Sequence, residues 1–288
     1  MTFLDFFAGI GGFRTALEST GHKCAGFIEI DKFAVESYRA IHDTKGEFYA
    51  SDIRAIDPVS LPATDLWAGG FPCQPWSCSG ARLGFEDARG TLIYEVFRLA
   101  AARKPQVIFL ENVVGLLTIS QGSAFRTILD ALGKLGYFVE WQCVNSAAYV
   151  PQSRPRIYII GHYGAVPGRT VFPVLPSDAE PNLKIAGNLN IEGLFQQADR
   201  VYSPDGISPC LDTSDDRPNI LTPDGRIRHL TSLEKWRCQG FSDEAFYKAA
   251  GVVSERQLHK QIGNSVSIPV IYEIAKRLKE IEDGGDAY

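Results

Sequence analysis

The chain has 288 residues, a net charge of −5 and an apolar content of 45%, which together are typical of an ordinary globular protein. No apolar run is long enough to span a bilayer, the first residues do not resemble a signal peptide, and six cysteines are too few for a disulfide framework. These features predict a cytoplasmic protein with reduced thiols, one large domain and a smaller attachment, and no membrane contact. No His or Cys spacing indicates a metal site.

The acidic net charge argues weakly against a nucleic-acid partner, because binding to phosphates needs clustered Lys and Arg. Residues 141–177, however, contain no carboxylate, while Arg154, Arg156 and Arg169 lie among them. This stretch could form a local basic face. The alternative is a surface that merely lacks acidic residues.

The first elements are typical of an open α/β sheet. Residues 2–7 form an apolar run predicted to be a strand, and the turn with Gly9, Gly11 and Gly12 leads into a helical pattern. Glycines there allow a tight turn and the close approach of a ligand to a helix N-terminus. A dinucleotide fingerprint would need a third glycine at the position of Arg14, so a nicotinamide site fits poorly.

Acidic residues follow the next two predicted strands. The strand over residues 23–30 ends at Glu29 and Ile30, and Asp31 precedes a helix predicted over residues 32–41. An acid at this place holds ribose hydroxyls in open α/β sheets, and Asp52 and Ile53 close the same pocket after a third strand. The alternative for each acid is a helix cap or a solvated charge, and for Asp31 the cap is preferred.

A single cysteine lies on a stiff loop after the apolar run at residues 66–68. Prolines on both sides of Cys73 remove backbone donors and restrict the chain. A side chain held in few conformations suits a nucleophile, whereas a lone cysteine is more often an inert buried residue.

A strongly apolar strand over residues 106–110 follows a helix predicted over residues 91–102, and it ends at Glu111 and Asn112. Burial at a strand end raises the pKa of a carboxyl, which is the condition for a general acid near neutral pH. A carboxylate satisfied by backbone amides is the alternative. A helix over 123–135 and a strand over 137–144 come next.

Two arginines, Arg154 and Arg156, precede an apolar strand at residues 157–160. In extended chain this spacing puts both on one face, where guanidiniums can bind phosphates or base edges. Surface charge is the alternative. From residue 162 onward prolines and glycines become frequent, which predicts a small, irregular, partly β second domain. A helical or hinge element at 228–241, a glycine turn at 261–266 and a last helix over 268–282 complete the chain.

In this order, the motifs resemble the cytosine carbon-5 DNA methyltransferase family. Nine blocks carry the resemblance over nearly the whole length: residues 7–12, 29–31, 52–53, 72–77, 87–90, 111–113, 152–156, 228–240 and 263–266. The resemblance implies an α/β, Rossmann-like S-adenosylmethionine-dependent methyltransferase domain formed by residues 1–161 and 262–288. It further implies a target-recognition domain over 162–227 and a hinge over 228–261.

The resemblance also implies roles for individual residues. Cys73 would attack carbon 6 of cytosine, Glu111 would protonate the ring nitrogen, Arg156 would contact the base carbonyl, Arg154 would support the loop, and Asn112 would orient Pro72 and Cys73. S-adenosylmethionine, without a metal, would bind with Phe7 against its adenine, Glu29 on its ribose and Asp52 near its adenine amino group. The further cofactor positions are Gly9, Gly11, Gly12, Ile30, Ile53, Asn264 and Val266, and the DNA-binding positions are Gln74, Ser77, Gln152 and Arg228.

The expected partner is double-stranded DNA, bound by a monomer, with a cognate restriction endonuclease as a separate protein of the same system. Two other functions stay open: methylation of cytosine in transfer RNA, and a catalytically silent DNA-binding regulator. The intact Cys73, Glu111 and Arg156 argue against the silent regulator. A cytosine deaminase is disfavoured because its zinc signatures are missing.

Overall fold

The computed structural model describes residues 1–72, 92–164, 170–174, 182–194 and 196–284. The strands are β1 (Thr2–Phe6), β2 (Lys23–Ile28), β3 (Phe48–Ala50), β4 (Leu66–Gly70), β5 (Val107–Val113), β6 (Tyr137–Asn145), β7 (Pro155–Tyr163), β8 (Ile185–Asn188), β9 (Arg200–Tyr202), β10 (Asn219–Leu221) and β11 (Ile227–His229). The helices are α1 (Gly12–Ser19), α2 (Lys32–Ile41), α3 (Leu92–Arg103), α4 (Ser123–Lys134), α5 (Gln196–Asp199), α6 (Ser232–Arg237), α7 (Asp243–Ala250), α8 (Glu255–Asn264) and α9 (Ile268–Glu282). Cys73, Gln74 and Ser77 lie outside the described residues.

The large sheet has the strand order β3-β2-β1-β4-β5-β7-β6. Strands β1 to β5 pair in parallel, whereas β7 runs antiparallel to both β5 and β6. The predicted α/β, Rossmann-like class is confirmed. Because β7 is antiparallel, its first residues lie beside the carboxyl end of β5.

Helices cover both faces of this sheet, as is required when parallel strands are apolar on both sides. On one face Phe3 and Phe109 are buried with residues of α1 and α9. On the other face Leu4 and Ile108 are buried with residues of α3 and α4.

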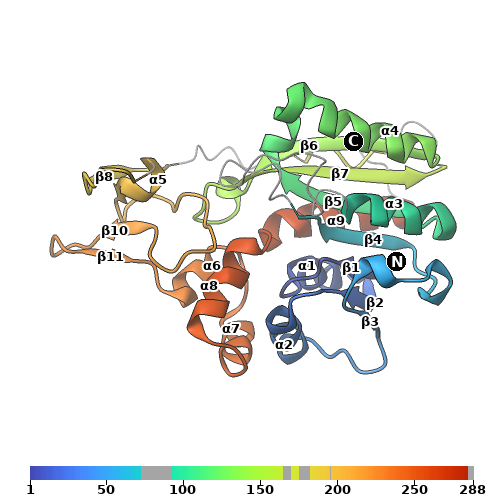
Figure 1. The fold of residues 1–288 in the computed structure, drawn as a ribbon, viewed down its shortest axis with the longest axis horizontal. Helices are drawn as coiled ribbons and strands as arrows, with labels where there is room; N and C mark the ends of the chain where they lie inside the picture. The colour runs from blue at the N-terminus through green and yellow to red at the C-terminus, as the bar shows by residue number, and fades with distance from the viewer. Residues whose placement is uncertain (73–91, 165–169, 175–181, 195, 285–288) are drawn as a thin grey trace.

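Among the described residues, a second sheet with the order β11-β10-β9-β8 lies with α5 to one side of the large sheet (Figure 1). Helix α6 begins at a capping box in which Thr231 and Glu234 bind each other's backbone amides. The fully buried Trp236 of α6 packs on Phe241 and Phe246, so α6, α7 and α8 join the core of the large domain.

The prediction of a glycine turn at residues 261–266 is wrong. Residues up to Asn264 continue α8, and Gly263 is helical. The glycine is needed for another reason: a Cβ at this position would lie 2.2 Å from the carbonyl oxygen of Asp212. A segment of the second domain therefore passes directly against the end of α8, and the predicted boundary at 261/262 falls inside this helix.

Candidate active site

The predicted site residues gather at one edge of the large sheet. Glu29 follows β2, Phe71 and Pro72 follow β4, and Glu111 and Asn112 are near the end of β5. The register of β7 pairs Arg156 with Val113 and Tyr158 with Glu111. Residues far apart in the sequence thus share one end of the sheet, because parallel strands end on the same side.

Glu111 and Arg156 form a nearly buried ion pair. The Nε of Arg156 lies 2.9 Å from Oε1 of Glu111, and the two side chains are 12% and 10% exposed, respectively. Burial raises the pKa of the Glu111 carboxyl, and the guanidiniums of Arg156 and Arg154 offset only part of this rise. The direction agrees with the general-acid role expected for Glu111.

Gly70 makes room for the Glu111 carboxyl. The two residues are partners across β4 and β5, and a Cβ at position 70 would lie 2.9 Å from Oε2 of Glu111. The sequence indicates a glycine at the strand end but not this role, since the contact depends on the register of the two strands. Gly70 therefore contacts the Glu111 carboxyl although it lies outside the nine sequence blocks named above.

Asn112 anchors the chain directly after β4. Its buried side chain donates from Nδ2 to the carbonyl of Phe71 at 3.2 Å, and its Oδ1 accepts from the amide of Val113 at 2.8 Å. Phe71 immediately precedes Pro72, so the amide fixes the chain where it enters residues 73–91. This contact agrees with the expected orienting role of Asn112.

Arg154, directly before β7, and Arg156, within β7, have different partners. Arg154 is buried and donates to the carbonyls of Leu211, Gly263 and Ser265 at 3.0, 3.0 and 2.6 Å. Its guanidinium is occupied by the protein's own backbone, so the phosphate-binding hypothesis does not fit Arg154. The supporting role that the resemblance implies for it does.

The predicted DNA contact of Gln152 does not match its position. This side chain is fully buried, donates from Nε2 to the carbonyl of Cys238 at 2.9 Å and accepts at Oε1 from the amide of Leu211 at 3.0 Å. Its amide group is satisfied by both domains and has no surface to offer DNA. Gln152 instead joins the second domain to the segment that contains Cys238.

The glycine turn after β1 leaves open space at Gly9. Phe7 and Gly9 have φ of 53° and 55°, in the left-handed region, which is costly for a residue with a side chain such as Phe7. A Cβ at Gly9 would meet none of the described residues within 4 Å. Glu29 accepts from the amides of Gly9 and Asp31 at 2.8 and 2.7 Å, which leaves further lone pairs on both oxygens. Burial raises the pKa of Glu29, and these backbone hydrogen bonds offset part of the rise.

Gly11 and Gly12 are needed for packing. A Cβ at Gly11 would lie 2.2 Å from Nε2 of His42, and one at Gly12 would lie 2.7 Å from Cγ2 of Val266. Val266 therefore lies against the glycine turn, as expected if both belong to the predicted cofactor site. Asn264, the other predicted cofactor residue of this segment, is exposed at the end of α8.

The remaining acids have local partners. Asp31 caps α2 through the amide of Phe33 at 2.9 Å, which confirms the preferred interpretation of this residue. Asp52 accepts from the Arg54 side chain and amide, and Ile53 after it is buried. Ile30 is 65% exposed beside Glu29 and offers an apolar surface there.

Comparison with known proteins identifies the family. Residues 1–197 and 187–280 match the model of the C-5 cytosine-specific DNA methylases. The chain belongs to this family. The chain is 34% identical to the Type II methyltransferase M.NgoBI of Neisseria gonorrhoeae, over 93% of the chain and 90% of that protein. It is 35% identical to the Type II methyltransferase M.HaeII of Haemophilus aegyptius, over 94% and 91%, respectively.

Solved structures confirm the fold of this methylase. The Entamoeba histolytica methyltransferase EhMeth superposes with a TM-score of 0.77 at 20% identity, over 98% of both chains. The putative DNA modification methyltransferase of an Escherichia coli prophage superposes with a TM-score of 0.70 at 19% identity, over 98% of this chain and 99% of that one.

Arg228, the first residue of the predicted hinge, is exposed on β11 of the small sheet and donates to Glu234 at 2.7 Å. Within the described ranges no cluster of acids, histidines and cysteines is able to hold a metal ion. No helix in that part of the chain is long and apolar enough to cross a membrane.

Proposed function

We propose that this protein transfers a methyl group from S-adenosylmethionine to carbon 5 of cytosine within a short sequence of double-stranded DNA. The observation that carries the proposal is the nearly buried Glu111–Arg156 pair at the sheet edge where β4 ends, a few residues before Cys73 in the sequence. A carboxyl with a raised pKa can give a proton to a heterocycle, and the guanidinium beside it can donate a hydrogen bond to the carbonyl of that heterocycle. Membership of the cytosine-specific family supports the choice of base.

The glycine turn fits S-adenosylmethionine, which supplies an electrophilic methyl group when bound. The open space at Gly9 admits a ligand close to the main chain, and the free lone pairs of Glu29 can accept from ribose hydroxyls. The exposed Ile30 offers an apolar contact to adenine, with Phe7 proposed on the opposite side. No metal is needed for this donor.

The chemistry explains the proposed protein groups. Carbon 5 of cytosine is a poor nucleophile, so the thiolate of Cys73 first adds to carbon 6 and pushes an electron pair into the ring. Glu111 gives a proton to the ring nitrogen that receives this charge, and Arg156 donates to the base carbonyl. After carbon 5 has taken the methyl group it loses its proton to solvent, and the electron pair of that C–H bond forms the double bond to carbon 6 and expels Cys73 as a thiolate. The ring nitrogen then returns its proton to Glu111. Asn112 holds the entry of the loop through the Phe71 carbonyl.

None of these atoms is accessible in a stacked duplex, so the base must be flipped out of it. Residues 162–227 are proposed as the target-recognition domain. Arg228, at the start of the hinge, is proposed as a DNA contact, as are Gln74 and Ser77. A monomer and a separate restriction endonuclease remain predictions, as does a cytoplasmic location.

Base-resolution bisulfite sequencing tests the proposal. Cells without cytosine methylation of their own would express the wild type or Cys73→Ser, and the amount of folded protein would be matched between them. We expect methylated cytosine in one short sequence context with the wild type and none with the variant. Unmodified DNA in both would contradict the proposal, and methylated transfer RNA from the same cells would establish the RNA alternative. DNA bound without any methylation would establish a silent regulator.

A further inference from the structure

The segment from Ser208 to Ser214 in the second domain is held on both sides by the catalytic domain. The amide of Ser208 donates to the carbonyl of Pro151 at 2.9 Å, and the carbonyl of Ser208 accepts from the amide of Ser153 at 2.8 Å. Farther along, the carbonyl of Ser214 accepts from Nζ of Lys235 at 2.8 Å. The chain on either side of Cys210 is therefore fixed in place.

Leu211 and Asp212 complete the attachment. Leu211 donates its amide to Gln152 at 3.0 Å and accepts at its carbonyl from Arg154 at 3.0 Å. The backbone of Asp212 lies so close to α8 that only glycine fits at position 263. Cys210 lies between Ser208 and Leu211, which are both held in this way, so its backbone has little freedom to move.

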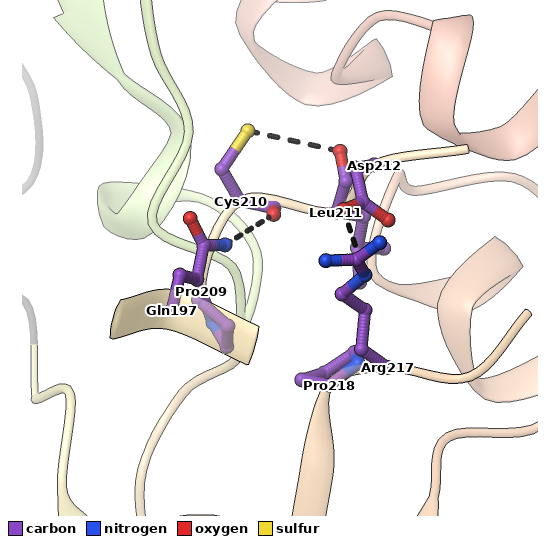
Figure 2. A pocket seen from close by; sticks show the side chains of 7 residues that line it. All are labelled: Gln197, Pro209, Cys210, Leu211, Asp212, Arg217 and Pro218. Carbon is purple, nitrogen blue, oxygen red and sulfur yellow. Dashed lines mark hydrogen bonds and ion pairs between the residues drawn. The ribbon is translucent and has the colours of Figure 1, made fainter. Parts of the chain in front are cut away.

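The sulfur of Cys210 lies against both arginines. Its Sγ is 3.5 Å from Nη1 of Arg154 and 3.8 Å from Nη2 of Arg156, and it is 3.7 Å from the carbonyl of Leu211. Figure 2 shows the side of this residue that faces a small pocket, where Gln197 donates to the Cys210 carbonyl at 3.1 Å. Burial raises the pKa of the Cys210 thiol, but the two guanidiniums outweigh burial and bring it below its ordinary value.

The guanidinium of Arg156 is thereby held at three of its nitrogens. Nε is 2.9 Å from Glu111, Nη1 donates to the carbonyl of its neighbour Pro155 at 2.8 Å, and Nη2 contacts Cys210. Pro155 belongs to the same strand and Glu111 to the adjacent strand, whereas Cys210 comes from the second domain. The sulfur is thus a contact through which the second domain reaches the catalytic pair.

We infer that Cys210 is a positioning residue for Arg156: its sulfur holds Nη2, and so sets the orientation in which Nε meets Glu111. The inference rests on the proposed function, because it concerns the geometry of that reaction. Docking of segment 208–214 on the catalytic domain then completes the active site. A methylase with this segment displaced would keep all its catalytic residues but lose their alignment.

The charges around the pair give the direction of a pH effect. Arg154, Arg156 and Tyr158 interact with Glu111. Asp212 and Arg217 line the pocket together with Cys210. The two guanidiniums lower the pKa of the Cys210 thiol and so favour its thiolate form, whose negative charge opposes the positive charge of Arg156. Without the sulfur, that charge acts more strongly on Glu111, lowers the pKa of its carboxyl and moves the alkaline fall in rate to lower pH.

Purified full-length protein with DNA and S-adenosylmethionine tests the inference through Cys210→Ala, Cys210→Ser and the exposed control Cys143→Ser. We expect Cys210→Ala to lower kcat between about 10-fold and 100-fold with little change in KM, since misplaced catalytic groups cost this much. The fall in kcat at alkaline pH, the alkaline limb of the pH–rate profile, should move to lower pH. Cys210→Ser should recover most of kcat because its hydroxyl also accepts, and Cys143→Ser should match the wild type.

An unchanged kcat and pH profile in Cys210→Ala would overturn the inference, as would a loss confined to KM or explained by a lower melting temperature. Inactive wild type and Cys143→Ser would instead reject the proposed function. A measurement independent of activity then decides the contact: the rate at which iodoacetamide alkylates Cys210 as a function of pH, read by peptide mass spectrometry. Arg156→Met should slow this alkylation at neutral pH, and equal rates in both proteins would overturn the inference.

Discussion

Arg156 places its Nε 2.9 Å from Oε1 of Glu111, and this contact exists because β7 runs antiparallel to β5. Each residue alone would be an unfavourable buried charge. Within the pair, only the protonation of Glu111 changes with pH, because the guanidinium of Arg156 stays protonated.

Glu111→Gln should lower kcat by about 10²- to 10⁴-fold, because an amide cannot act as the general acid. The wild-type rate should be highest below the raised pKa of Glu111 and fall as the pH rises through it, because the protonated form is the active one. The residual activity of the variant should lack this alkaline limb. Steady-state rates across pH check both points, and an unchanged limb in Glu111→Gln would assign it to another group.

Arg156→Met should shift the alkaline limb in the opposite direction to Cys210→Ala. Burial raises the pKa of Glu111 and Arg156 opposes the rise, so removal of the guanidinium raises this pKa further and moves the limb to higher pH. The rate should also fall at every pH, because the proposed contact to the base carbonyl is lost. A limb that moved to lower pH would contradict the pairing.

Gly70→Ala should impair catalysis while the fold stays intact. At short range its Cβ would meet only the far end of the Glu111 side chain, so we expect the carboxyl to shift and kcat to fall by about 100-fold. Gly69→Ala is the matched contrast, because a Cβ there would lie 2.1 Å from the backbone oxygen of Phe6. Thermal melts should show a large loss for position 69 and a small one for position 70, and full activity in Gly70→Ala would refute the assignment.

Gln152→Ala should reduce the free energy of unfolding by about 1–3 kcal/mol, because buried groups such as the Leu211 amide lose their partner. Arg228→Ala, which breaks an exposed pair with Glu234, should cost at most about 1 kcal/mol. The effect on DNA should be the reverse: Arg228→Ala should reduce the salt slope of binding by about 1. Urea unfolding and binding at several salt concentrations distinguish the two, and equal stability losses would contradict the burial argument.

Asp5→Asn should change how stability depends on pH. Asp5 is 1% exposed, its Oδ1 has no hydrogen-bond partner among the described residues, and burial raises its pKa well above the ordinary value. The folded protein therefore holds this proton more tightly than the unfolded chain, and its stability falls as the pH rises from the unfolded pKa toward the folded one. The variant should lose this slope and the exposed Asp205→Asn should keep it, as melting temperatures across pH would show.

The sequence was sufficient for the order of the elements in the large domain. The last helix is found at Ile268–Glu282 as its apolar stripe predicts, and Asp31 caps α2 as its position before Lys32 predicts. Such local signals depend on neighbours along the chain, so they can be read without the fold. The motifs likewise predicted which residues meet at the sheet edge.

The sequence was not sufficient for contacts between the domains. Gln152 and Arg154 lie in a polar motif that resembles a surface, yet both are buried by residues 208–214 and the end of α8. Gly263 resembles a turn residue but serves a close approach of two backbones. Cys210 had no motif at all. Each of these roles depends on where an irregular segment crosses the catalytic domain, which no periodicity encodes.

The attachment of residues 208–214 has a consequence for exchanging recognition modules between methylases. The small sheet divides into β8 and β9 before this segment and β10 and β11 after it, while the segment itself belongs to the catalytic framework through Gln152, Arg154 and Gly263. A graft that carries over both halves but keeps the recipient's own 208–214 should retain turnover with a new target sequence. A graft that replaces the sheet as one continuous block would replace the framework with it.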